Sequence, residues 1–398
     1  MEPKIKKDSR IKGKSLGMVV CLCLWTAAQA QGEILTSPQD ALQIRIAVFK
    51  DLEGFQLSLN SRYKILAIPT GETLSEGRGI KDSRVKASSN AIMIGDQKYP
   101  VDRLHIVPQY DTTLSVNNRR FRGTIQVIKN ANNRLLVVNV VGLEDYVRGV
   151  LYHEISQHWP RDALKAQSVA TRTYALKRWQ EMKTQDFDVT SDIYSQVYGG
   201  RSAERYRINQ AVRGTRGQVL LYQGKILPAY FHATCAGATE DANELWKEDL
   251  APLKGGVCGF CIKSPHYLWK KNLRLKDIQD KLNAHGHTLG LIKEIKVLER
   301  NKSGRIRRLE ITTREGQTII VSGKEFREIL GPNLIKSNNY VILMKGYYVD
   351  FIGRGWGHGV GMCQWGVYEM ARQRYRYDEI LKFYYPGSEM VRIGKVNP

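Results

Sequence analysis

Two pairs of potential metal ligands stand in the second half of the chain, each with two residues between its members. The pairs are His232 with Cys235 and Cys258 with Cys261. Two such pairs separated by a loop are the spacing typical of a closed tetrahedral zinc site. Because protein ligands would fill all four positions, the zinc ion would be structural. The sequence therefore predicts one structural Zn²⁺ and no organic cofactor.

Disulfide bonds are the alternative for the same cysteines, since cysteines of exported proteins commonly oxidise. A bridge could join Cys258 to Cys261, or one of these two residues to Cys235. Three cysteines cannot all pair with one another, which favours metal. His266 is an alternative ligand.

The elements that position these residues begin with a β-rich segment. Residues 44–48 and 55–59 alternate apolar and polar side chains, with turn residues between them, which predicts strands. No residues in this segment have the types and spacing of a catalytic site. We therefore expect residues 31–115 to form a small β-rich N-terminal module.

The following part of the chain mixes strands and helices. Strands are expected at 121–127 and 135–141, joined by an asparagine-rich turn. Pro160 stands where the first residue of a helix would lie, so residues 161–182 are predicted to form a long helix. A further helix is expected at about 364–374, directly after a glycine-rich loop.

Between about residues 271 and 343 the pattern changes to a polar helical stretch followed by alternating strands, which predicts an inserted α/β subdomain. The expected fold class is α+β, with β-rich layers around the 161–182 helix. We expect the main domain to span residues 116–398 and to contain this insertion.

Residues 1–30 have the organisation of a secretory signal peptide. A basic region precedes the apolar run at 16–28, and Ala28-Gln29-Ala30 forms a small-x-small cleavage site. The apolar run is short for a membrane span, and an uncleaved anchor is the alternative. We expect an exported protein, in the periplasm, the cell wall or the medium, without a membrane span after cleavage.

The chain is strongly basic, with 61 Lys and Arg against 39 Asp and Glu and a net charge of +22. Such a surface favours polyanionic partners, namely nucleic acid, anionic lipid or an acidic envelope polymer. Export argues against nucleic acid. The alternative is a solvated basic surface that aids solubility.

Four separated segments together resemble the SpoIID/LytB domain family. They occur in the family's order, over roughly residue 121 to the C-terminus, at 153–176, 195–200, 231–240 and 355–366. The resemblance implies a SpoIID-like catalytic domain with peptidoglycan lytic transglycosylase activity, which cleaves between N-acetylmuramic acid (MurNAc) and N-acetylglucosamine (GlcNAc). The family's catalytic glutamate maps to Glu154 and its helix arginine to Arg172. The family usually has serine where this chain has Cys363.

The expected reaction needs one carboxyl group. A glycosidic oxygen is a poor leaving group and must be protonated as its bond breaks, which is the role predicted for Glu154. The C6 hydroxyl of the same sugar then attacks the anomeric carbon and loses its proton to the same residue. Partial burial beside Tyr152, Ile155 or Trp159 would raise the pKa of this acid. The alternative is a glutamate that merely complements a helix N-terminus.

Further residues are expected along a glycan groove. The resemblance implies substrate binding by Arg172, Ser195, Gln196, Tyr198, His358, Gln364 and Trp365. Arg172 is equally consistent with a buried structural ion pair, and His358 with a loop histidine bonded to backbone. Expected partners are peptidoglycan glycan strands, including strands stripped of stem peptides, and a wall amidase.

Two other functions remain open at this point. A hydrolytic muramidase would use Asp145, Asp192 or Glu240 as its second carboxylate. A non-catalytic wall-binding protein would instead stimulate an amidase. The end group of the product separates the first alternative from the transglycosylase, because hydrolysis leaves a reducing end.

Overall fold

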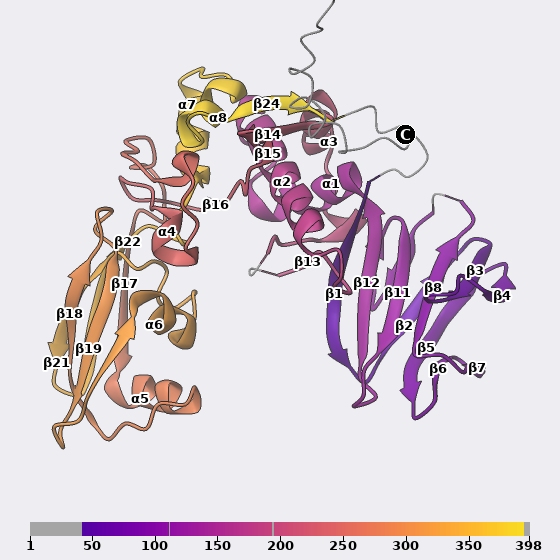
Figure 1. Ribbon diagram of the computed structural model, residues 1–398, viewed down its shortest axis with the longest axis horizontal. Helices are drawn as coiled ribbons and strands as arrows, with labels where there is room; N and C mark the ends of the chain where they lie inside the picture. Colours follow the sequence, from indigo (N-terminus) through magenta and orange to yellow (C-terminus); the bar gives the residue numbers. More distant parts are fainter. Residues whose placement is uncertain (1–41, 111, 193–194, 394–398) are drawn as a thin grey trace, which may run out of the picture. The chain divides into compact units, whose positions relative to one another are not determined.

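The computed structural model describes residues 42–110, 112–192 and 195–393 (Figure 1). The predicted signal peptide lies outside these residues. Helices account for 26% and strands for 38% of the structure, and most strands pair antiparallel, which is consistent with the predicted α+β class. Among the described residues, no helix is long and apolar enough to cross a membrane.

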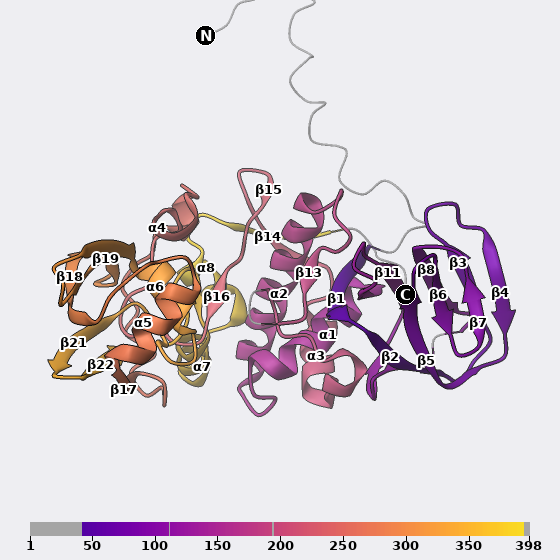
Figure 2. The ribbon, with the colours of Figure 1, turned by 90° about the horizontal axis from the view of Figure 1, so that it is seen from below.

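Two β-sheets share one hydrophobic core (Figure 2). The first sheet has the strand order β13 (Val189–Thr190), β1 (Gln43–Leu52), β12 (Leu135–Gly142), β11 (Thr124–Lys129), β8 (Arg103–Pro108), β3 (Tyr63–Ala67) and β4 (Thr73–Gly77). The second has the order β10 (Arg119–Phe121), β9 (Leu114–Val116), β2 (Gly54–Leu59), β5 (Ile80–Ser88), β6 (Ala91–Ile94) and β7 (Gln97–Tyr99). Alternate residues of strands in both sheets are buried, as a two-layer β arrangement requires.

Strand pairing crosses the expected boundary between residues 115 and 116. Strand β1 pairs with β12 from Gln43↔Gly142 to Leu52↔Leu135, and β8 pairs with β11. The expected N-terminal module and the start of the main domain therefore share a sheet. Alternation along a strand predicts which side chains are buried, but it does not name the strand's partner.

The helices that follow this sheet, together with two helices from the C-terminal part of the chain, pack around one long helix. Helix α2 (Arg161–Glu181), close to the predicted range, packs against α1 (Leu143–Glu154), α3 (Tyr206–Gly214), α7 (Gln364–Arg372) and α8 (Tyr377–Tyr384). Ala163, Ala166 and Ala170 are fully buried, and their small side chains allow this close approach. A 3₁₀ turn, η1 (Gly200–Ala203), contacts α1, and a small sheet joins β15 (Lys225–Ile226), β14 (Gln218–Tyr222) and β24 (Glu389–Arg392).

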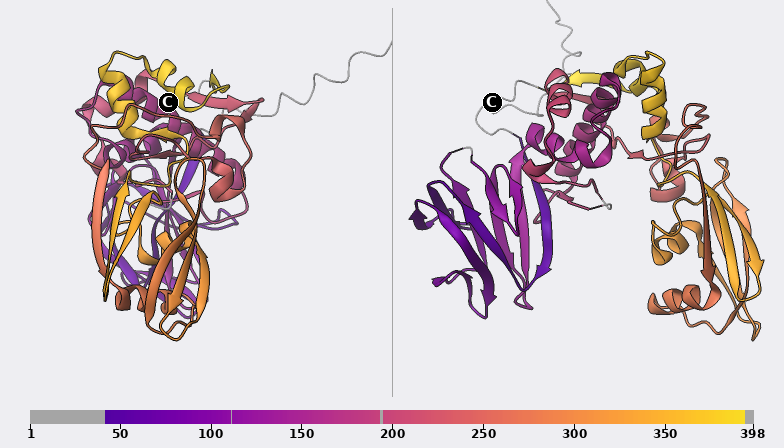
Figure 3. Two further views of the ribbon diagram at one scale, coloured as in Figure 1. Left: turned by 90° about the vertical axis from the view of Figure 1, so that its left-hand side faces the viewer. Right: turned by 180° about the vertical axis from the view of Figure 1, so that it is seen from behind.

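The strands and helices of the inserted segment lie together in the views of Figure 3. They have a hydrophobic core of their own, which includes Ile278, Leu309, Phe326 and Phe351. Its elements are β17 (Leu268–Arg274), α5 (Leu275–Ala284), β18 (Ile292–Arg300), β19 (Ile306–Thr313), β20 (Thr318–Ser322), α6 (Gly323–Leu330), β21 (Tyr340–Lys345) and β22 (Tyr348–Arg354). Because β17 pairs with β22 from Leu268↔Arg354 to Arg274↔Tyr348, this unit extends beyond the expected 271–343.

Four short elements connect the insertion to the helices: β16 (Phe231–His232), α4 (Ala242–Trp246), η2 (Ala251–Leu253) and β23 (Met362–Cys363). Strands β16 and β23 are parallel, with His232 opposite Cys363.

Candidate active site

Glu154 is the last residue of α1, and its carboxyl group receives hydrogen bonds from two distant segments. The backbone N–H of Val197 donates to Oε1 at 3.1 Å, and Nε2 of Gln364 donates to Oε2 at 3.2 Å. Gln364 is the first residue of α7 and is buried. The half-buried Glu154 is therefore held between three segments that the fold brings together.

The surroundings of Glu154 raise the pKa of its carboxyl group. Burial is the largest cause, because it penalises the charged form, and the hydrogen bonds from Val197 and Gln364 oppose it in part. The structure places Glu154 at the C-terminal end of a helix, not at the N-terminus of the alternative interpretation. The partial negative charge at a helix C-terminus also disfavours a carboxylate. Both effects shift the pKa of Glu154 upward, the direction that a general acid needs.

A cavity of about 410 Å³ lies near this carboxyl group, because its lining residue Gln196 directly precedes Val197, which bonds Glu154. Glu154 itself is not among the lining residues. Its walls are aromatic and polar: Tyr174, Arg178, Ser195, Gln196, Tyr230, Phe231, Trp246, Glu248 and His358. Aromatic rings combined with several polar groups that face one space are a lining that suits a polar small molecule. Sequence reasoning did not select Tyr174 and Phe231, although both lie in the motif segments 153–176 and 231–240. It also missed Arg178, Tyr230, Trp246 and Glu248, which lie outside those segments.

Trp365, the second residue of α7, is also expected to bind substrate. Half-buried aromatic side chains surround it. Its ring lies 5.4 Å from Trp159 and 5.3 Å from Tyr368, in edge-to-face geometry. His266, suggested as an alternative metal ligand, instead contacts Trp365 and Trp356 by its ring. Trp365 directly follows Gln364, whose side chain bonds the Glu154 carboxyl group.

Arg172 does not contact Glu154. Its side chain is fully buried and forms two hydrogen bonds of 2.8 Å to the two carboxylate oxygens of Glu144, and a third of 3.0 Å to the carbonyl of Gln218. The structure thus corresponds to the ion-pair alternative, and the expected contact with sugar is not supported. The reason is helical geometry, which turns position 172 toward α1 and β14.

Replacing Arg172 by Met is expected to destabilise the fold by about 3–5 kcal/mol, because Glu144 would remain as an uncompensated buried charge. Chemical denaturation measures this loss. Glu76→Gln, which removes the exposed ion pair with Lys64, is the control and should change stability by less than about 1 kcal/mol. Unchanged stability of the Arg172→Met protein, with lost substrate affinity, would contradict this assignment.

Two further residues expected in the groove, Tyr198 and His358, form their hydrogen bonds with other groups of the protein. Tyr198 is buried, stacks on Tyr146 at 5.5 Å and donates its phenolic hydrogen bond to Asn139 at 2.8 Å, so it lies in the core and not along the cavity. His358 does line the cavity, but both of its ring nitrogens bond to backbone, at Phe231 and Val360. Burial lowers the pKa of His358 to about 3, which keeps the ring neutral.

Ser195 and Gln196 both line the cavity, as the sequence predicted for a glycan groove. The hydroxyl oxygen of Ser195 accepts a hydrogen bond from the backbone N–H of Thr190 at 3.1 Å. Gln196 is fully buried and accepts a hydrogen bond from Tyr146.

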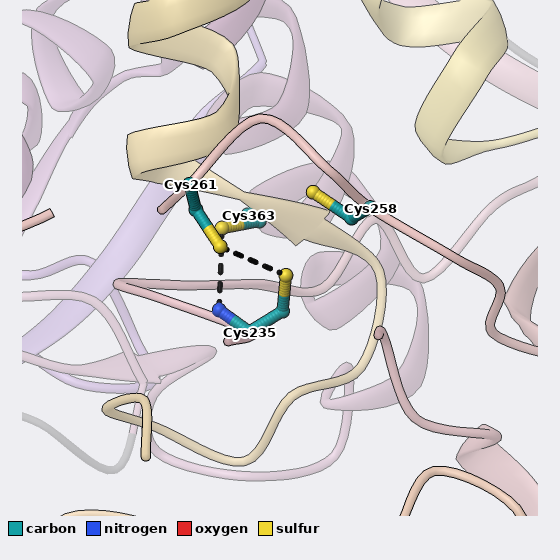
Figure 4. A group of neighbouring side chains, drawn as sticks. All are labelled: Cys235, Cys258, Cys261 and Cys363. Atoms are coloured by element: carbon teal, nitrogen blue, oxygen red, sulfur yellow. Dashed lines mark hydrogen bonds between the residues drawn. The ribbon is translucent and has the colours of Figure 1, made fainter. Parts of the chain in front are cut away.

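Four buried cysteines, Cys235, Cys258, Cys261 and Cys363, form a cluster whose sulfur atoms all lie within 4.8 Å of one another (Figure 4). They form no disulfide. The expected ligand His232 is not in the cluster. Its Nδ1 bonds the carbonyl of Val360 at 3.0 Å, and its Nε2 is buried without a partner. Parallel pairing of β16 with β23 supplies Cys363 in its place. The sequence signal for Cys363 was that the family usually has serine at this position.

The chemistry of this cluster fits a metal ion. Four thiolates are the donor set of a closed structural zinc site. The backbone N–H of Cys235 donates to the sulfur of Cys363 at 3.3 Å, and Tyr384 O–H lies 3.2 Å from the sulfur of Cys258. Such contacts orient thiolates and offset their charge. Buried Arg305, which bonds the carbonyl of Cys235, adds a positive charge nearby.

The carboxylates considered for a hydrolase are engaged elsewhere. Asp145 forms an ion pair with Arg148 and stands nine residues before Glu154 on α1, about 13 Å along the axis. Buried Glu240 accepts hydrogen bonds from Asn301 and Ser303 of the insertion. Asp192 is exposed and bonded to Thr190.

The fold and the site together define an α+β protein with one acid of raised pKa beside a polar, aromatic-lined cavity, and with a separate four-cysteine cluster. The family described as "Stage II sporulation protein" matches residues 131–222, and a domain of unknown function (DUF8618) matches residues 260–361. With the relatives below, these matches show that the chain belongs to the SpoIID family.

Three similar proteins are of particular use. An uncharacterized protein of Brachyspira hyodysenteriae is 34% identical over 293 residues, which cover 73% of this chain and 78% of that protein. Stage II sporulation protein D of Bacillus subtilis is 28% identical over 67% of this chain and 78% of its own length. An amidase enhancer of Bacillus subtilis is 28% identical over 92% of this chain, which spans 58% of that protein.

Proposed function

We propose that this protein is a peptidoglycan lytic transglycosylase with Glu154 as its general acid and base. It cleaves the bond between MurNAc and GlcNAc without water. The observation that carries the proposal is the single carboxyl group of raised pKa, held by Val197 and Gln364 beside a cavity suited to a sugar.

In the first half of the reaction, protonated Glu154 gives its proton to the glycosidic oxygen, and the bond to C1 of MurNAc breaks. In the second half, the C6 hydroxyl of the same MurNAc forms a bond to C1 and its proton passes to the Glu154 carboxylate. The products are a 1,6-anhydroMurNAc end and a free hydroxyl on GlcNAc, and the acid is restored.

Val197 and Gln364 suit both halves of this cycle. Their N–H groups donate to the two carboxylate oxygens, so they stabilise the base form between the steps, while burial raises the pKa and favours the acid form. The nucleophile belongs to the substrate, so no second carboxylate is needed. Asp145 and Glu240 are engaged elsewhere, and Glu248 in the cavity wall accepts a hydrogen bond from Tyr230.

Mass spectrometry of the products tests the reaction. Peptidoglycan, intact or stripped of stem peptides, is expected to release fragments with 1,6-anhydroMurNAc ends. Fragments with reducing MurNAc ends would overturn the proposal in favour of hydrolysis. Incubation in H₂¹⁸O provides the control, because the transglycosylase product takes up no ¹⁸O at C1.

We further propose that Cys235, Cys258, Cys261 and Cys363 hold one structural zinc ion. With four protein ligands, the ion would supply no open position for chemistry. Its role would be to tie the segments before and after the insertion together, since Cys261 precedes β17 and Cys363 follows β22.

Export to the cell envelope is part of the same proposal. The expected signal peptide would deliver the chain there, and the net charge of +22 would favour contact with the carboxylates of peptidoglycan.

A non-catalytic role is the second candidate, favoured by the similarity to an amidase enhancer. In that case the protein would bind the wall and stimulate a wall amidase. It would release no glycan fragments, and Glu154→Gln would retain the full stimulation.

A further inference from the structure

We propose that one face of the inserted unit is a docking surface for an anionic lipid membrane. The face belongs to the three-stranded sheet in which β17, β22 and β21 lie side by side (Figure 1). None of its residues is among those that line the cavity near Glu154, so this inference does not depend on the proposed reaction.

This sheet buries one of its two sides. Trp269 on β17, Tyr340 on β21, and Val349 and Phe351 on β22 belong to the hydrophobic core of the insertion. Successive residues of a strand point to opposite faces of a sheet. The residues between these four therefore point away from that core.

Large apolar side chains concentrate on the outward side. Ile352 and Val341 lie opposite each other in the strand pairing, and Leu343, Tyr348 and Leu268 extend the group along the three strands. These five side chains are between 39% and 64% exposed. A single exposed apolar residue is ordinary, but a contiguous group marks an interaction surface.

The same side carries more positive than negative charge. Lys270, Lys345 and Arg354 lie on it, and Asp350 is the one carboxylate that these three strands contain. Asp350 is shared by Lys270 at 3.2 Å and Lys345 at 2.7 Å, so it balances only one of the two. A further cation, Arg274, pairs with a carboxylate of α5. The face therefore attracts an anionic partner.

Apolar side chains interspersed with cations fit the surface of an anionic membrane. The apolar groups would enter the boundary between headgroups and acyl chains, and the cations would contact lipid phosphates. Tyr347 and Tyr348, at the turn between β21 and β22, are exposed and have the amphipathic rings that are enriched at this boundary. A second copy of the chain is a poorer partner, since two such faces would repel each other.

Sedimentation of the full chain with lipid vesicles tests this surface. The parent is expected to bind vesicles of phosphatidylglycerol and phosphatidylcholine at least tenfold more tightly than vesicles of phosphatidylcholine alone. Leu343→Thr combined with Ile352→Thr removes apolar surface but retains residues that favour strands, and should lower the partition coefficient at least tenfold. Arg354→Gln should lower it about fivefold, the contribution of one cation near an anionic surface.

Ile320→Thr is the matched control, because Ile320 is an exposed residue of β20 in the other sheet of the insertion. It should bind vesicles like the parent. All these proteins share one N-terminus, so the apolar run at 16–28 contributes equally to each of them.

Absence of binding by the parent, or equal binding by the parent and both variants of the face, would overturn the proposal. A parent dimer in light scattering that Leu343→Thr with Ile352→Thr abolishes, without vesicle binding, would instead assign the face to a second copy. Thermal unfolding identifies a double variant that fails to fold. Arg354→Gln, at an exposed position, then decides alone.

Discussion

Glu154→Gln is expected to lower the rate of glycan release by at least about 10³-fold, because the amide can neither donate the proton nor accept it back. Gln matches the shape of Glu and retains an oxygen for the hydrogen bond from Val197. Release of anhydro-ended fragments from purified peptidoglycan, followed by chromatography, measures the change. Asp378→Gln, which alters an exposed ion pair with Arg376, serves as the control for a lost surface carboxylate.

The same variant separates catalysis from stability. Folding raises the pKa of Glu154, so the folded state holds this proton more tightly than the unfolded chain. The resulting stabilisation is fully present at pH values below the unfolded pKa and is lost as pH rises through the raised pKa. Glu154→Gln should therefore be as stable as the parent or more stable at neutral pH. Parallel loss of activity and of stability would instead indicate a structural residue.

The raised pKa of Glu154 should also limit the rate of glycan release on the alkaline side of its pH profile. The reaction begins with protonated Glu154, so the rate is expected to decline as pH rises through the raised pKa of this group. A pH–rate profile with no alkaline limb assignable to a carboxyl group would argue against Glu154 as the acid.

Cys363→Ser is expected to abolish stoichiometric zinc binding, although the family's usual residue at this position is serine. The purified parent protein should contain about one zinc per chain. A structural zinc site contributes directly to folding, so its loss should cost at least about 3 kcal/mol and lower the unfolding midpoint by at least about 4 °C. Metal analysis and thermal unfolding with and without a chelator measure both effects.

His232→Asn is the matched control for the zinc site. It lies opposite Cys363 in the strand pair but bonds the backbone of Val360, and it is outside the sulfur cluster. We expect this variant to retain its zinc. Loss of metal from His232→Asn together with retention by Cys363→Ser would restore the ligand set inferred from sequence spacing, and metal-free parent protein would refute the site altogether.

Local patterns of the sequence were sufficient for several elements. Pro160 and the periodic residues after it predicted a helix that the structure places at Arg161–Glu181, and the alternation in 55–59 matches strand β2. The motif resemblance predicted the family. These successes share a cause, because helix starts and strand faces depend on residues close together in the chain.

Tertiary structure alone decided which distant residues meet. Spacing paired His232 with Cys235, but the parallel contact of β16 with β23 brings in Cys363 from the far side of the insertion. Arg172 was consistent with either sugar or an ion pair until helix packing placed it against Glu144. The cavity next to Glu154 takes Trp246 and Glu248 from a segment without any motif. Short-range patterns determine local conformation, whereas ligand sets, ion pairs and cavities depend on contacts between elements that the sequence does not specify pair by pair.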